Sequence, residues 1–565
     1  MELLKSLILL LAGVGVFIVG MNMMGDGLEK GAGKGLKKLL AKISNNRIAG
    51  VGIGTAVTGI IQSSSATSVM VIGLVNAGVM TLFQATAIIM GANIGTTVTG
   101  LIVALSGSKG AISFSDIAIL LAFIGVMMMF VKKEKVKLIG SILCGLGIIF
   151  VGLGIMGDAL DPDKFPQLTS TFASVFTAID FPLILIVLGA VFTAIIQSSS
   201  AATGIVITLV GATTALGEPV LAVSSALFIV LGSNIGTCVT AVIACLGAGT
   251  NAKRAAFIHL LFNIIGTIVF TALIWPLQDK VVWLLEKIPN SQMQLAWFHV
   301  IFNITTTAVL LPFIKQLVWL AEKAIPEKKK TEEERHLKFV DERLLKTPSV
   351  ALMQVKREVG YMATLAQENI ERSFAALQKD GEKTFVAIEE TESIIDFTNH
   401  ALTKYLVKLS PLVDRKDEKE IGAYFHVLND LERIGDHAEN FGEIAVQMQE
   451  RGLEFSDGAK AELKNMEDCV LKMFKIAIEA ISSGNPAHLG ELTALENQTD
   501  ELKRELSSQH YVRLAEGGCK LELSPYFTSM VTGLERVADH LVNVGYSILN
   551  PTGSQSEAKK DAAKA

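Results

Sequence analysis

The chain has 565 residues, half of them hydrophobic, with a mean hydropathy of +0.46 and a formal net charge of −5. Residues 1–320 carry 18 Lys and Arg against 12 Asp and Glu, whereas residues 321–565 carry 32 against 43. This split indicates a membrane part followed by an acidic soluble part, and it excludes a disordered chain, an ordinary water-soluble enzyme and a nucleic-acid-binding protein with a dense basic surface.

Apolar runs predict the membrane crossings. A bilayer core of about 30 Å needs about 20 apolar residues per helix. Seven runs of that kind lie near residues 3–24, 80–105, 113–131, 138–157, 222–247, 255–275 and 295–320. Two further apolar segments, 48–77 and 183–211, are interrupted by the letters QSSS. We expect each to form a re-entrant hairpin, because irregular backbone at membrane depth is tolerated where protein or water surrounds it.

Positive charges in the loops predict the orientation. Lys and Arg gather at 30–47, 132–137 and 253–254, and the alternate loops hold few of them. By the positive-inside rule these three loops face the cytoplasm. With seven crossings, the N-terminus then lies outside and the C-terminal domain lies in the cytoplasm. We therefore expect a multi-pass protein of the cytoplasmic (inner) membrane.

The membrane part contains an internal duplication. The matching segments are 11–28 with 143–160, 58–68 with 193–203, and 91–105 with 232–246. They follow the same order in both copies, at offsets that drift from 132 to 141. Each copy holds three crossings and a hairpin, so the second copy is predicted to be inverted relative to the first. Secondary transporters share this plan and bind their substrate near the bilayer midplane, between the repeats.

The duplicated segments supply uncharged polar groups where the spans hold almost no ionisable residues. Hydroxyl and amide oxygens suit a hard monovalent cation such as Na⁺. Hydroxyl donors and free N–H groups at a helix start suit an oxyanion. We also expect the two Asn-Ile-Gly triplets to unwind locally and free carbonyls for a cation. The candidate substrate- and sodium-binding residues are Gln62, Ser63, Ser64, Ser65, Thr67, Ser68, Asn93, Thr96, Gln197, Ser198, Ser199, Ser200, Thr203, Asn234 and Thr237.

A structural interpretation competes with binding at each of these positions. Hydroxylated residues are normal at helix interfaces in membranes, where they often bond back to their own helix. We favour that interpretation for an isolated Ser or Thr, and binding for a duplicated Gln-Ser-Ser-Ser run. His259 and His299 form a smaller echo, in HLLFN and HVIFN. There we favour interfacial packing and hydrogen bonding over proton sensing.

The paired QSSSA and NIGT segments resemble those of the bacterial type II sodium/phosphate cotransporter family, over about residues 1–320. The resemblance implies Na⁺-coupled transport of inorganic phosphate by alternating access, with Ser and Gln of both QSSS runs around substrate and sodium. The sequence contains no P-loop, so ATP is not the expected energy source, and we expect no enzymatic activity. It does not set the direction of transport.

Carboxylate pairs recur in the soluble part, which is otherwise typical of amphipathic helices. The pairs are Glu392/Asp396, Glu432/Asp436, Glu496/Asp500 and Glu535/Asp539. Offsets of 103 and 104 between them predict a duplication of two three-helix units. Spacing of four places each pair on one helix face, where like charges repel. A divalent or trivalent metal between helices would relieve that repulsion, and a solvated acidic face is the alternative.

The segments LERIGDH (431–437) and LERVADH (534–540) resemble the PhoU family, over about 348–550. The resemblance implies a six-helix bundle, phosphate-linked regulation and, in some members, metal at the acid pairs. The predicted fold class is thus all-α, namely a polytopic membrane protein with two inverted repeats, each with a re-entrant hairpin, followed by a cytoplasmic PhoU-like six-helix bundle.

The predicted domains are a membrane transport domain at 1–320 (repeat one about 1–131, repeat two about 136–275, extra span about 295–320), a charged connector at 321–347, the PhoU-like domain at 348–550 and a disordered tail at 551–565. The expected partners are inorganic phosphate and membrane lipid, with no nucleic acid. The sequence leaves open a homo-oligomer and signalling partners of the PhoU-like domain. The rival hypotheses are a membrane-anchored phosphate-signalling scaffold and a transporter of another oxyanion.

Overall fold

A computed structural model describes residues 2–41, 46–107, 114–179, 181–246, 248–327, 336–377, 381–483 and 489–549. The chain divides into two compact units, Met1–Lys330 and Thr331–Ala565. Both are helical. Within the described residues, the β-structure is limited to one isolated bridge between Thr213 and Pro219.

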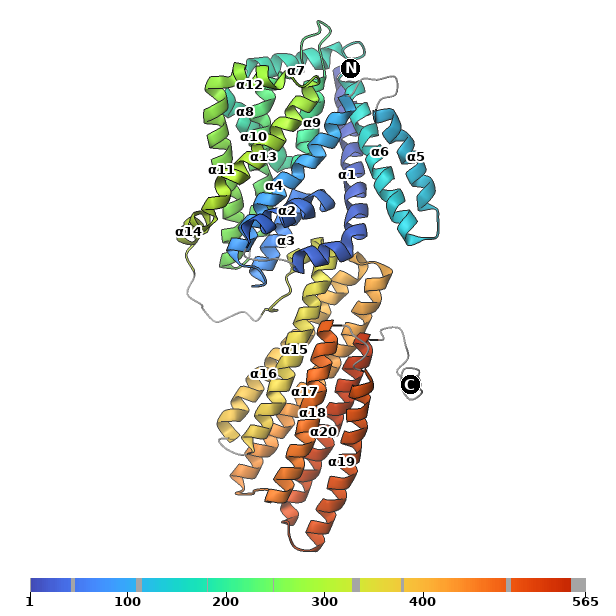
Figure 1. The fold of residues 1–565 in the computed structure, drawn as a ribbon, viewed down its shortest axis with the longest axis vertical. Helices are drawn as coiled ribbons and strands as arrows, with labels where there is room; N and C mark the ends of the chain where they lie inside the picture. Colours follow the sequence, from blue (N-terminus) through green and yellow to red (C-terminus); the bar gives the residue numbers. More distant parts are fainter. Residues whose placement is uncertain are drawn as a thin grey trace. The chain divides into compact units, whose positions relative to one another are not determined.

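The first unit is built from helices throughout its described part (Figure 1). Their bounds are α1 (Glu2–Ala41), α2 (Arg47–Ile61), α3 (Ser64–Asn76), α4 (Leu82–Ala104), α5 (Phe114–Met129), α6 (Glu134–Ala159), α7 (Pro166–Ala178), α8 (Pro182–Ile196), α9 (Ser199–Gly211), α10 (Val223–Ala244), α11 (Thr250–Ile274), α12 (Gln278–Leu285), α13 (Ser291–Leu310) and α14 (Ile314–Ala324). Short 3-10 turns join α11 to α12 and α13 to α14. Each contains a proline, Pro276 or Pro312, which lacks the N–H group needed to continue the helical bonding.

Six helical stretches of the described residues are long and apolar enough to cross a membrane. They are the first 31 described residues of α1, then α4, α6, α10, α11 with α12, and α13 with α14. The sequence predicted a seventh crossing at 113–131. That segment contains α5, which has 16 described residues and begins directly after residues 108–113, which lie outside the described part, so the seventh crossing stays a prediction. α5 packs along α6, and α6 packs along α1.

The two segments interrupted by QSSS each form a helix, a break and a second helix. The first pair is α2 and α3, and the second is α8 and α9. Each of these helices has 13 or 15 residues and is too short to span a bilayer alone. The break therefore lies where the sequence predicted it, between two apolar half-helices. Their position in a membrane, and the inversion of the second copy, stay predictions.

Glycines set the spacing of the helix pairs in both copies, α2 against α4 and α8 against α10. A Cβ atom on Gly54 of α2 would lie 2.0 Å from the carbonyl oxygen of Ile88 on α4. A Cβ atom on Gly189 of α8 would lie 2.1 Å from the carbonyl oxygen of Ile229 on α10. No larger residue fits at either position without moving a helix. The two copies thus use the same contact at equivalent positions.

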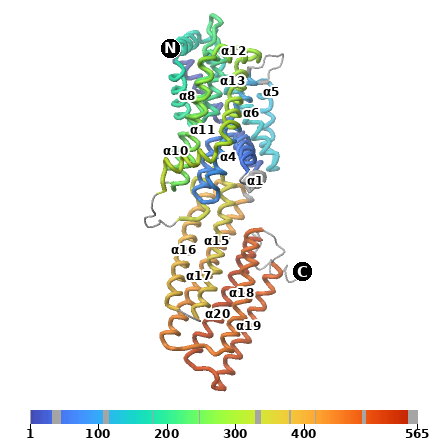
Figure 2. The backbone as a smooth tube through the Cα atoms, turned by 60° about the vertical axis from the view of Figure 1, so that its left-hand side comes forward, coloured from blue at the N-terminus to red at the C-terminus, as the bar shows by residue number. Residues whose placement is uncertain are grey.

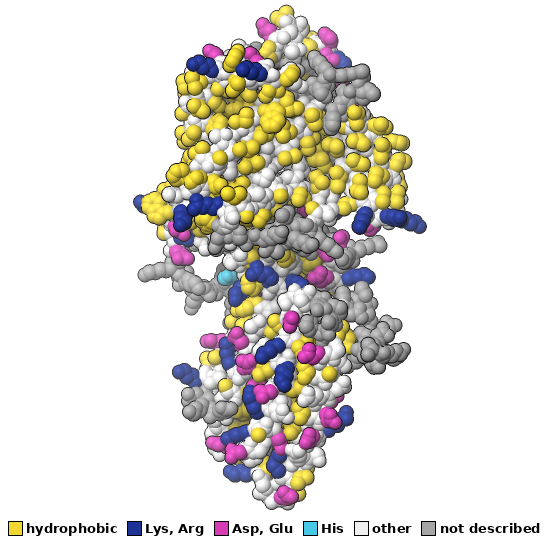
Figure 3. Space-filling view, viewed as in Figure 1, with side chains coloured by type: hydrophobic (Ala, Val, Ile, Leu, Met, Phe, Trp, Pro, Cys, Tyr) yellow, Lys and Arg dark blue, Asp and Glu magenta, His cyan; other side chains and the backbone are white. Residues whose placement is uncertain are grey.

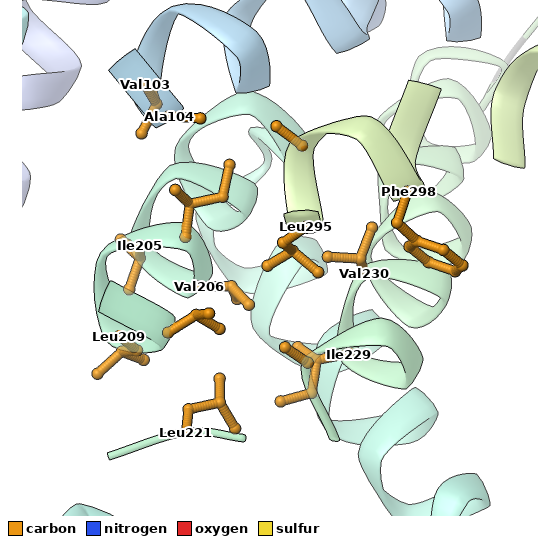
Figure 4. Close-up of a cluster of buried hydrophobic side chains, with 14 of the residues drawn as sticks. Val103, Ala104, Ile205, Val206, Leu209, Leu221, Ile229, Val230, Leu295 and Phe298 are labelled. Carbon is orange, nitrogen blue, oxygen red and sulfur yellow. The ribbon is translucent and has the colours of Figure 1, made fainter. Parts of the chain in front are cut away.

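On the face shown in Figure 3, hydrophobic side chains dominate the first unit, and charged side chains gather at the two ends of the hydrophobic area. This distribution is typical of a protein that lies in a bilayer. Beneath it, a buried cluster joins α4, α9, α10 and α13, with Val103, Ile205, Val230 and Phe298 among its members (Figure 4). The cluster packs α9 and α10 of the second copy against α4 of the first.

The second unit is a bundle of long helices, seen as the yellow to red part of the tube in Figure 2. Their bounds are α15 (Pro348–Ala376), α16 (Gly381–Leu409), α17 (Arg415–Glu450), α18 (Asp457–Ser483), α19 (Leu489–Ala515) and α20 (Ser524–Leu549). α15, α16 and α17 pack together, as do α18, α19 and α20, and α17 contacts α20 between the two sets. The six helices in two sets of three agree with the fold class predicted from the sequence.

The predicted boundaries differ in detail from the elements that the structure contains. α14 continues to Ala324, and Glu342–Lys346 forms a 3-10 helix, so both ends of the expected connector at 321–347 carry regular structure. The middle of that connector, 328–335, lies outside the described residues, as does the predicted disordered tail at 551–565.

Candidate transport site

Each hairpin breaks at its glutamine. Gln62 (φ 57°, ψ 23°) follows α2, and Gln197 (φ 57°, ψ 22°) follows α8, both in the left-handed conformation. They are the only residues other than glycine with positive φ among those described. This conformation is uncommon for such residues and has to be held by the surrounding structure. The two hairpins therefore share the same uncommon backbone conformation at their breaks.

The next serine of each run restarts the helix. Ser63 and Ser198 have extended backbones, and their side chains accept hydrogen bonds from the backbone N–H groups of Ala66 (3.1 Å) and Ala201 (3.2 Å). This is the role of an N-cap, which satisfies one of the open N–H groups of a helix start. The two capping serines thus serve the local structure, and the remaining serines of each run lie on α3 and α9.

The two hairpins meet at the first residues of α3 and α9. The Oγ atoms of Ser64 and Ser199 lie 3.5 Å apart, and both side chains are buried. Ser200 beside them is buried and Ser65 is half-buried. Because Ser64 and Ser199 open their helices, two helix N-termini converge here. Such termini carry partial positive charge and open N–H groups, so their meeting point favours an oxyanion.

Two further hydroxyls lie one turn into these helices. Ser68 and Thr203 occupy equivalent positions and are buried, and their hydroxyl oxygens have no hydrogen-bond partner within the described part of the chain. Thr67, in contrast, contacts the Thr58 hydroxyl at 3.0 Å and donates to the Ser63 carbonyl at 3.1 Å. A buried hydroxyl is costly unless a partner satisfies it. Ser68 and Thr203 therefore fit a ligand-binding role better than Thr67, which holds its hairpin together.

The two glutamines have different surroundings. Gln62 is buried; its Oε1 accepts a hydrogen bond from Thr99 of α4 at 2.9 Å, and its Nε2 donates to the Gly59 carbonyl at 2.5 Å. Gln197 is exposed. Thr240, the equivalent of Thr99, has a buried hydroxyl without a partner among the described residues. The first hairpin is thus tied to its neighbouring helix, and this tie is unmade in the second copy.

Asn93 and Asn234 lie on α4 and α10, which run as unbroken helices through both Asn-Ile-Gly triplets. The local unwinding expected from the sequence is therefore wrong. The glycines of the triplets instead allow close packing, since a Cβ on Gly236 would lie 2.3 Å from the Ala190 carbonyl oxygen of α8. Their carbonyls remain engaged in the helices and are not available to a cation.

The threonines after these triplets follow the structural interpretation. Thr96 and Thr237 are buried, and each hydroxyl donates to a carbonyl one turn earlier, that of Ala92 at 3.1 Å or Ser233 at 3.0 Å. Bonds of this kind are common for hydroxylated residues in membrane helices. These two predicted site residues thus have partners within their own helices.

His299 and Asn303, which the sequence did not predict as site residues, form hydrogen bonds with Asn234, which it did predict. The side-chain amide of Asn234 donates from Nδ2 to Asn303 Oδ1 at 3.0 Å, and its Oδ1 lies 3.2 Å from His299 Nε2. His299 and Asn303 lie on α13 and are buried, as is His259 on α11. Both histidines are buried in the protein and not at a membrane interface, and His299 makes a hydrogen bond of the kind that the sequence analysis favoured. The repeated HxxFN spacing was the available signal.

In the second unit, two of the predicted acid pairs gather. Glu392 and Asp396 on α16 lie within electrostatic range of Glu432 and Asp436 on α17. Burial, together with neighbouring carboxylates of which Glu439 is foremost, raises the pKa of Glu392 to about 7. Burial is also the first cause that raises the pKa of Glu432 and of Asp436. Burial and mutual repulsion in the cluster thus favour the protonated form of Glu392.

The other two acid pairs are arranged differently. Glu535 of α20 forms an ion pair with Lys503 of α19 at 2.9 Å, and Glu496 is buried. The aspartates of these pairs differ as well, since Asp500 on α19 is half-buried and Asp539 on α20 is exposed. A lysine therefore already offsets the charge of Glu535, and water screens that of Asp539. Neither carboxylate needs a metal ion to relieve repulsion.

The predicted carboxylates do not form a metal centre in the structure. Among the described residues, no three His, Cys, Asp or Glu side chains are grouped so that they could hold a metal ion. In this respect the structure differs from the expected metal sites, whose ligands were Glu392, Asp396, Glu432, Asp436, Glu496, Asp500, Glu535 and Asp539. The spacing of four places two carboxylates on one helix face, but a third ligand depends on how neighbouring helices pack. Metal binding at these residues stays a prediction.

Comparison with known proteins follows the same division into two units. Residues 16–158 and 170–284 match the Na⁺/Pi-cotransporter family, and residues 359–445 and 463–548 match the PhoU domain. YqeW of Bacillus subtilis, an uncharacterized protein, is 32% identical over 284 residues, which are 50% of this chain and 86% of YqeW. The chain belongs to the Na⁺/Pi-cotransporter family.

One further relative of this Na⁺/Pi-cotransporter family member matches nearly the whole chain, and another matches about a third of it. YjbB of Salmonella typhimurium, a putative inorganic phosphate export protein, is 25% identical over 557 residues, which are 98% of this chain and 99% of YjbB. PhoU homolog 1 of Thermotoga maritima, a phosphate-specific transport system accessory protein, is 25% identical over 197 residues, which are 34% of this chain and 83% of that protein. The resemblances to both families are thus confirmed, and the chain is a multi-pass membrane protein with PhoU domains.

Proposed function

We propose that the chain couples Na⁺ movement to the transport of inorganic phosphate, by alternating access to a site between the two serine hairpins. The observation that carries this proposal is the meeting of α3 and α9, whose first residues, Ser64 and Ser199, lie 3.5 Å apart. Phosphate would be held by the open N–H groups of both helix starts and by serine hydroxyls. The family and the name of the relative YjbB support phosphate as the substrate.

Sodium would be held by the neutral oxygens around the same loops. Ser68 and Thr203 offer buried hydroxyl oxygens without protein partners among the described residues. The side-chain oxygens of Gln62 and Gln197 are further candidates, because hard cations prefer such ligands.

Sodium coupling also makes electrical sense. Each elementary charge that crosses a potential of about 100 mV is worth about 2.3 kcal/mol. Uptake of an anion into a negative interior therefore requires cotransported cations, and the net direction follows the combined gradients. Because YjbB is named as an export protein, outward flux is to be measured as well as uptake.

We place the protein in the cytoplasmic membrane, with the N-terminus outside and the second unit in the cytoplasm. The Lys-rich loop around Lys132 to Lys137 supports this orientation. The second unit would then regulate transport in response to cytoplasmic phosphate or metal. The acidic cluster around Glu392 is its candidate sensor, because a bound cation would relieve the repulsion between α16 and α17.

Radioactive phosphate flux in proteoliposomes tests the function. With an inward Na⁺ gradient, the wild-type chain is expected to accumulate phosphate at least tenfold faster than with an equal K⁺ gradient, and excess sulfate is expected to compete weakly. Equal rates with both cations would contradict coupling to Na⁺. Strong competition by sulfate would indicate that the substrate is another oxyanion.

The same assay tests regulation on a chain that lacks residues 348–565. Its flux is expected to lose the dependence on phosphate and divalent metal at the cytoplasmic side that the full chain shows. Identical responses of the two proteins would remove the regulatory role, while transport itself would stand.

A further inference from the structure

Helices α11 and α13 occupy equivalent places against the two copies, and both contact α4 and α10. Thr267 of α11 donates to the Leu231 carbonyl of α10 at 3.2 Å, and Thr307 of α13 donates to the Met90 carbonyl of α4 at 3.4 Å. The donors are 40 residues apart, as are the two HxxFN segments, and the acceptors are 141 apart, as are the two Asn-Ile-Gly triplets. α11 therefore stands to α10 as α13 stands to α4.

This equivalence relates two sets of three polar residues. Asn234, His299 and Asn303 form the first set, which we call the Asn234 triad. Three hydrogen bonds link it: Asn234 Nδ2 donates to Asn303 Oδ1 at 3.0 Å, His299 Nε2 lies 3.2 Å from Asn234 Oδ1, and Asn303 Nδ2 donates to the His299 carbonyl at 2.9 Å. His299 Nδ1 has no partner among the described residues. All three side chains are buried. The triad therefore ties α13 to α10.

The equivalent residues, Asn93, His259 and Asn263, form the Asn93 triad, which is not closed. The local bond from Asn263 Nδ2 to the His259 carbonyl is kept, at 3.0 Å. Within the described part of the chain, however, Asn93 Nδ2, His259 Nε2 and Asn263 Oδ1 have no hydrogen-bond partner, although the three side chains are buried. These are the atoms whose equivalents bond in the Asn234 triad. The same chemistry is thus made in one copy and unmade in the other.

The tie between glutamine and threonine differs between the copies in the opposite sense. In the first copy Thr99 bonds to Gln62, whereas in the second Thr240 has no partner in the described residues and Gln197 is exposed. Each copy therefore has one tie made and one unmade. Because a buried polar group without a partner is costly, this pattern is expected of one member of a pair of states that exchange their ties.

We propose that His259, Asn263, His299 and Asn303 are positioning residues for transport, which bind Asn93 and Asn234 in turn as the site changes access. In the state described here the Asn234 triad and the Gln62–Thr99 bond are closed. In the opposite state the Asn93 triad and a Gln197–Thr240 bond close in their place. The inference rests on the proposed transport function for its role, and on the equivalent bonds for its geometry.

Three variants of the full chain test this exchange by phosphate flux and phosphate binding. Asn303→Leu removes the closed tie, and Asn263→Leu prevents the opposite one, each with a side chain that keeps the branching at Cγ but has no polar atoms. Each single variant is expected to lower flux at least tenfold, while phosphate affinity changes less than threefold. The double variant is expected to recover at least threefold over either single variant, because the two states are then balanced again. A merely structural role predicts that the double variant is the slowest.

Thr267→Val is the matched control, since its backbone bond has a counterpart at Thr307 that is also made, and it is expected to keep wild-type flux. Hydrogen exchange of the purified variants measures which of the two states is populated, and it does so without a transport assay. Asn303→Leu is expected to speed exchange at residues 59–66 and slow it at 194–201. Asn263→Leu is expected to produce neither change, because the bonds that Asn263 makes in this state, to the His259 carbonyl and to Cys238 Sγ, do not involve either loop. If both loops change in the same direction, or the double variant is slowest, the exchange is refuted. If wild type carries no phosphate but the loops respond as expected, the transport proposal fails and the switch stands.

Discussion

Within each Gln-Ser-Ser-Ser run, neighbouring side chains of the same type have different roles. Ser63 caps α3, whereas Ser64 beside it faces Ser199 of the other hairpin. The backbone conformation of Gln62 determines which serine caps the helix and which lies on it. The sequence predicted that these residues belong to the site, but it could not assign their separate roles. Those roles depend on one residue in the left-handed conformation.

The chemistry of Glu392 leads to a prediction on stability. Its pKa is raised from 4.5 to about 7 in the folded state, so folding disfavours its charged form. The folded unit then binds more protons than the unfolded chain between these values, and its stability falls as the pH rises from about 4.5 to 7. Glu392→Gln is expected to slow hydrogen exchange of α16 and α17 at pH 8, and to change it little at pH 4.5.

A chelator in the buffer keeps bound cations from masking this effect. Glu390→Gln on the exposed side of the same helix is the control, and it is expected to leave exchange unchanged at both pH values. Faster exchange of the Glu392 variant at pH 8 would show that the charged carboxylate is stabilising.

At the scale of elements, the membrane unit depends on two equivalent close contacts between helices. Gly54 of α2 and Gly189 of α8 lie close to the backbones of α4 and α10, so each sets the spacing of its helix pair. Periodicity and composition predicted these helices and their breaks. They did not predict that α4 and α10 are unbroken, because helix winding depends on neighbours that are distant in sequence.

Gly54→Ala and Gly189→Ala are expected to destabilise the first unit by roughly 1–3 kcal/mol or more, because the added methyl group meets a backbone oxygen near 2 Å. Gly52→Ala on α2 is the matched control, since nothing lies within 4 Å of its Cβ position. Thermal unfolding in detergent, followed by tryptophan fluorescence, measures the difference. Equal melting of the Gly54 variant and the control would show that the contact is looser than described.

For the whole molecule, composition alone separated the two units, and duplicated segments indicated the pairing within each. The sequence could not give the partners of His259 and His299, because α11 and α13 lie outside the longer matches and meet α4 and α10 only in the folded protein. Nor could it show that equivalent bonds are made in one copy and unmade in the other. That difference is a property of one conformational state, whereas the same sequence is compatible with every state that the protein adopts.

The central claim is that phosphate crosses the membrane between Ser64 and Ser199. The most direct measurement is Na⁺-driven phosphate flux by Ser64→Ala and Ser199→Ala, with Thr208→Ala as control, because its hydroxyl bonds back to Gly204 within α9. We predict at least a tenfold loss of flux in each serine variant, near wild-type flux in the control, and unchanged folding in all three. Near-normal flux in both serine variants would contradict the assignment of the site.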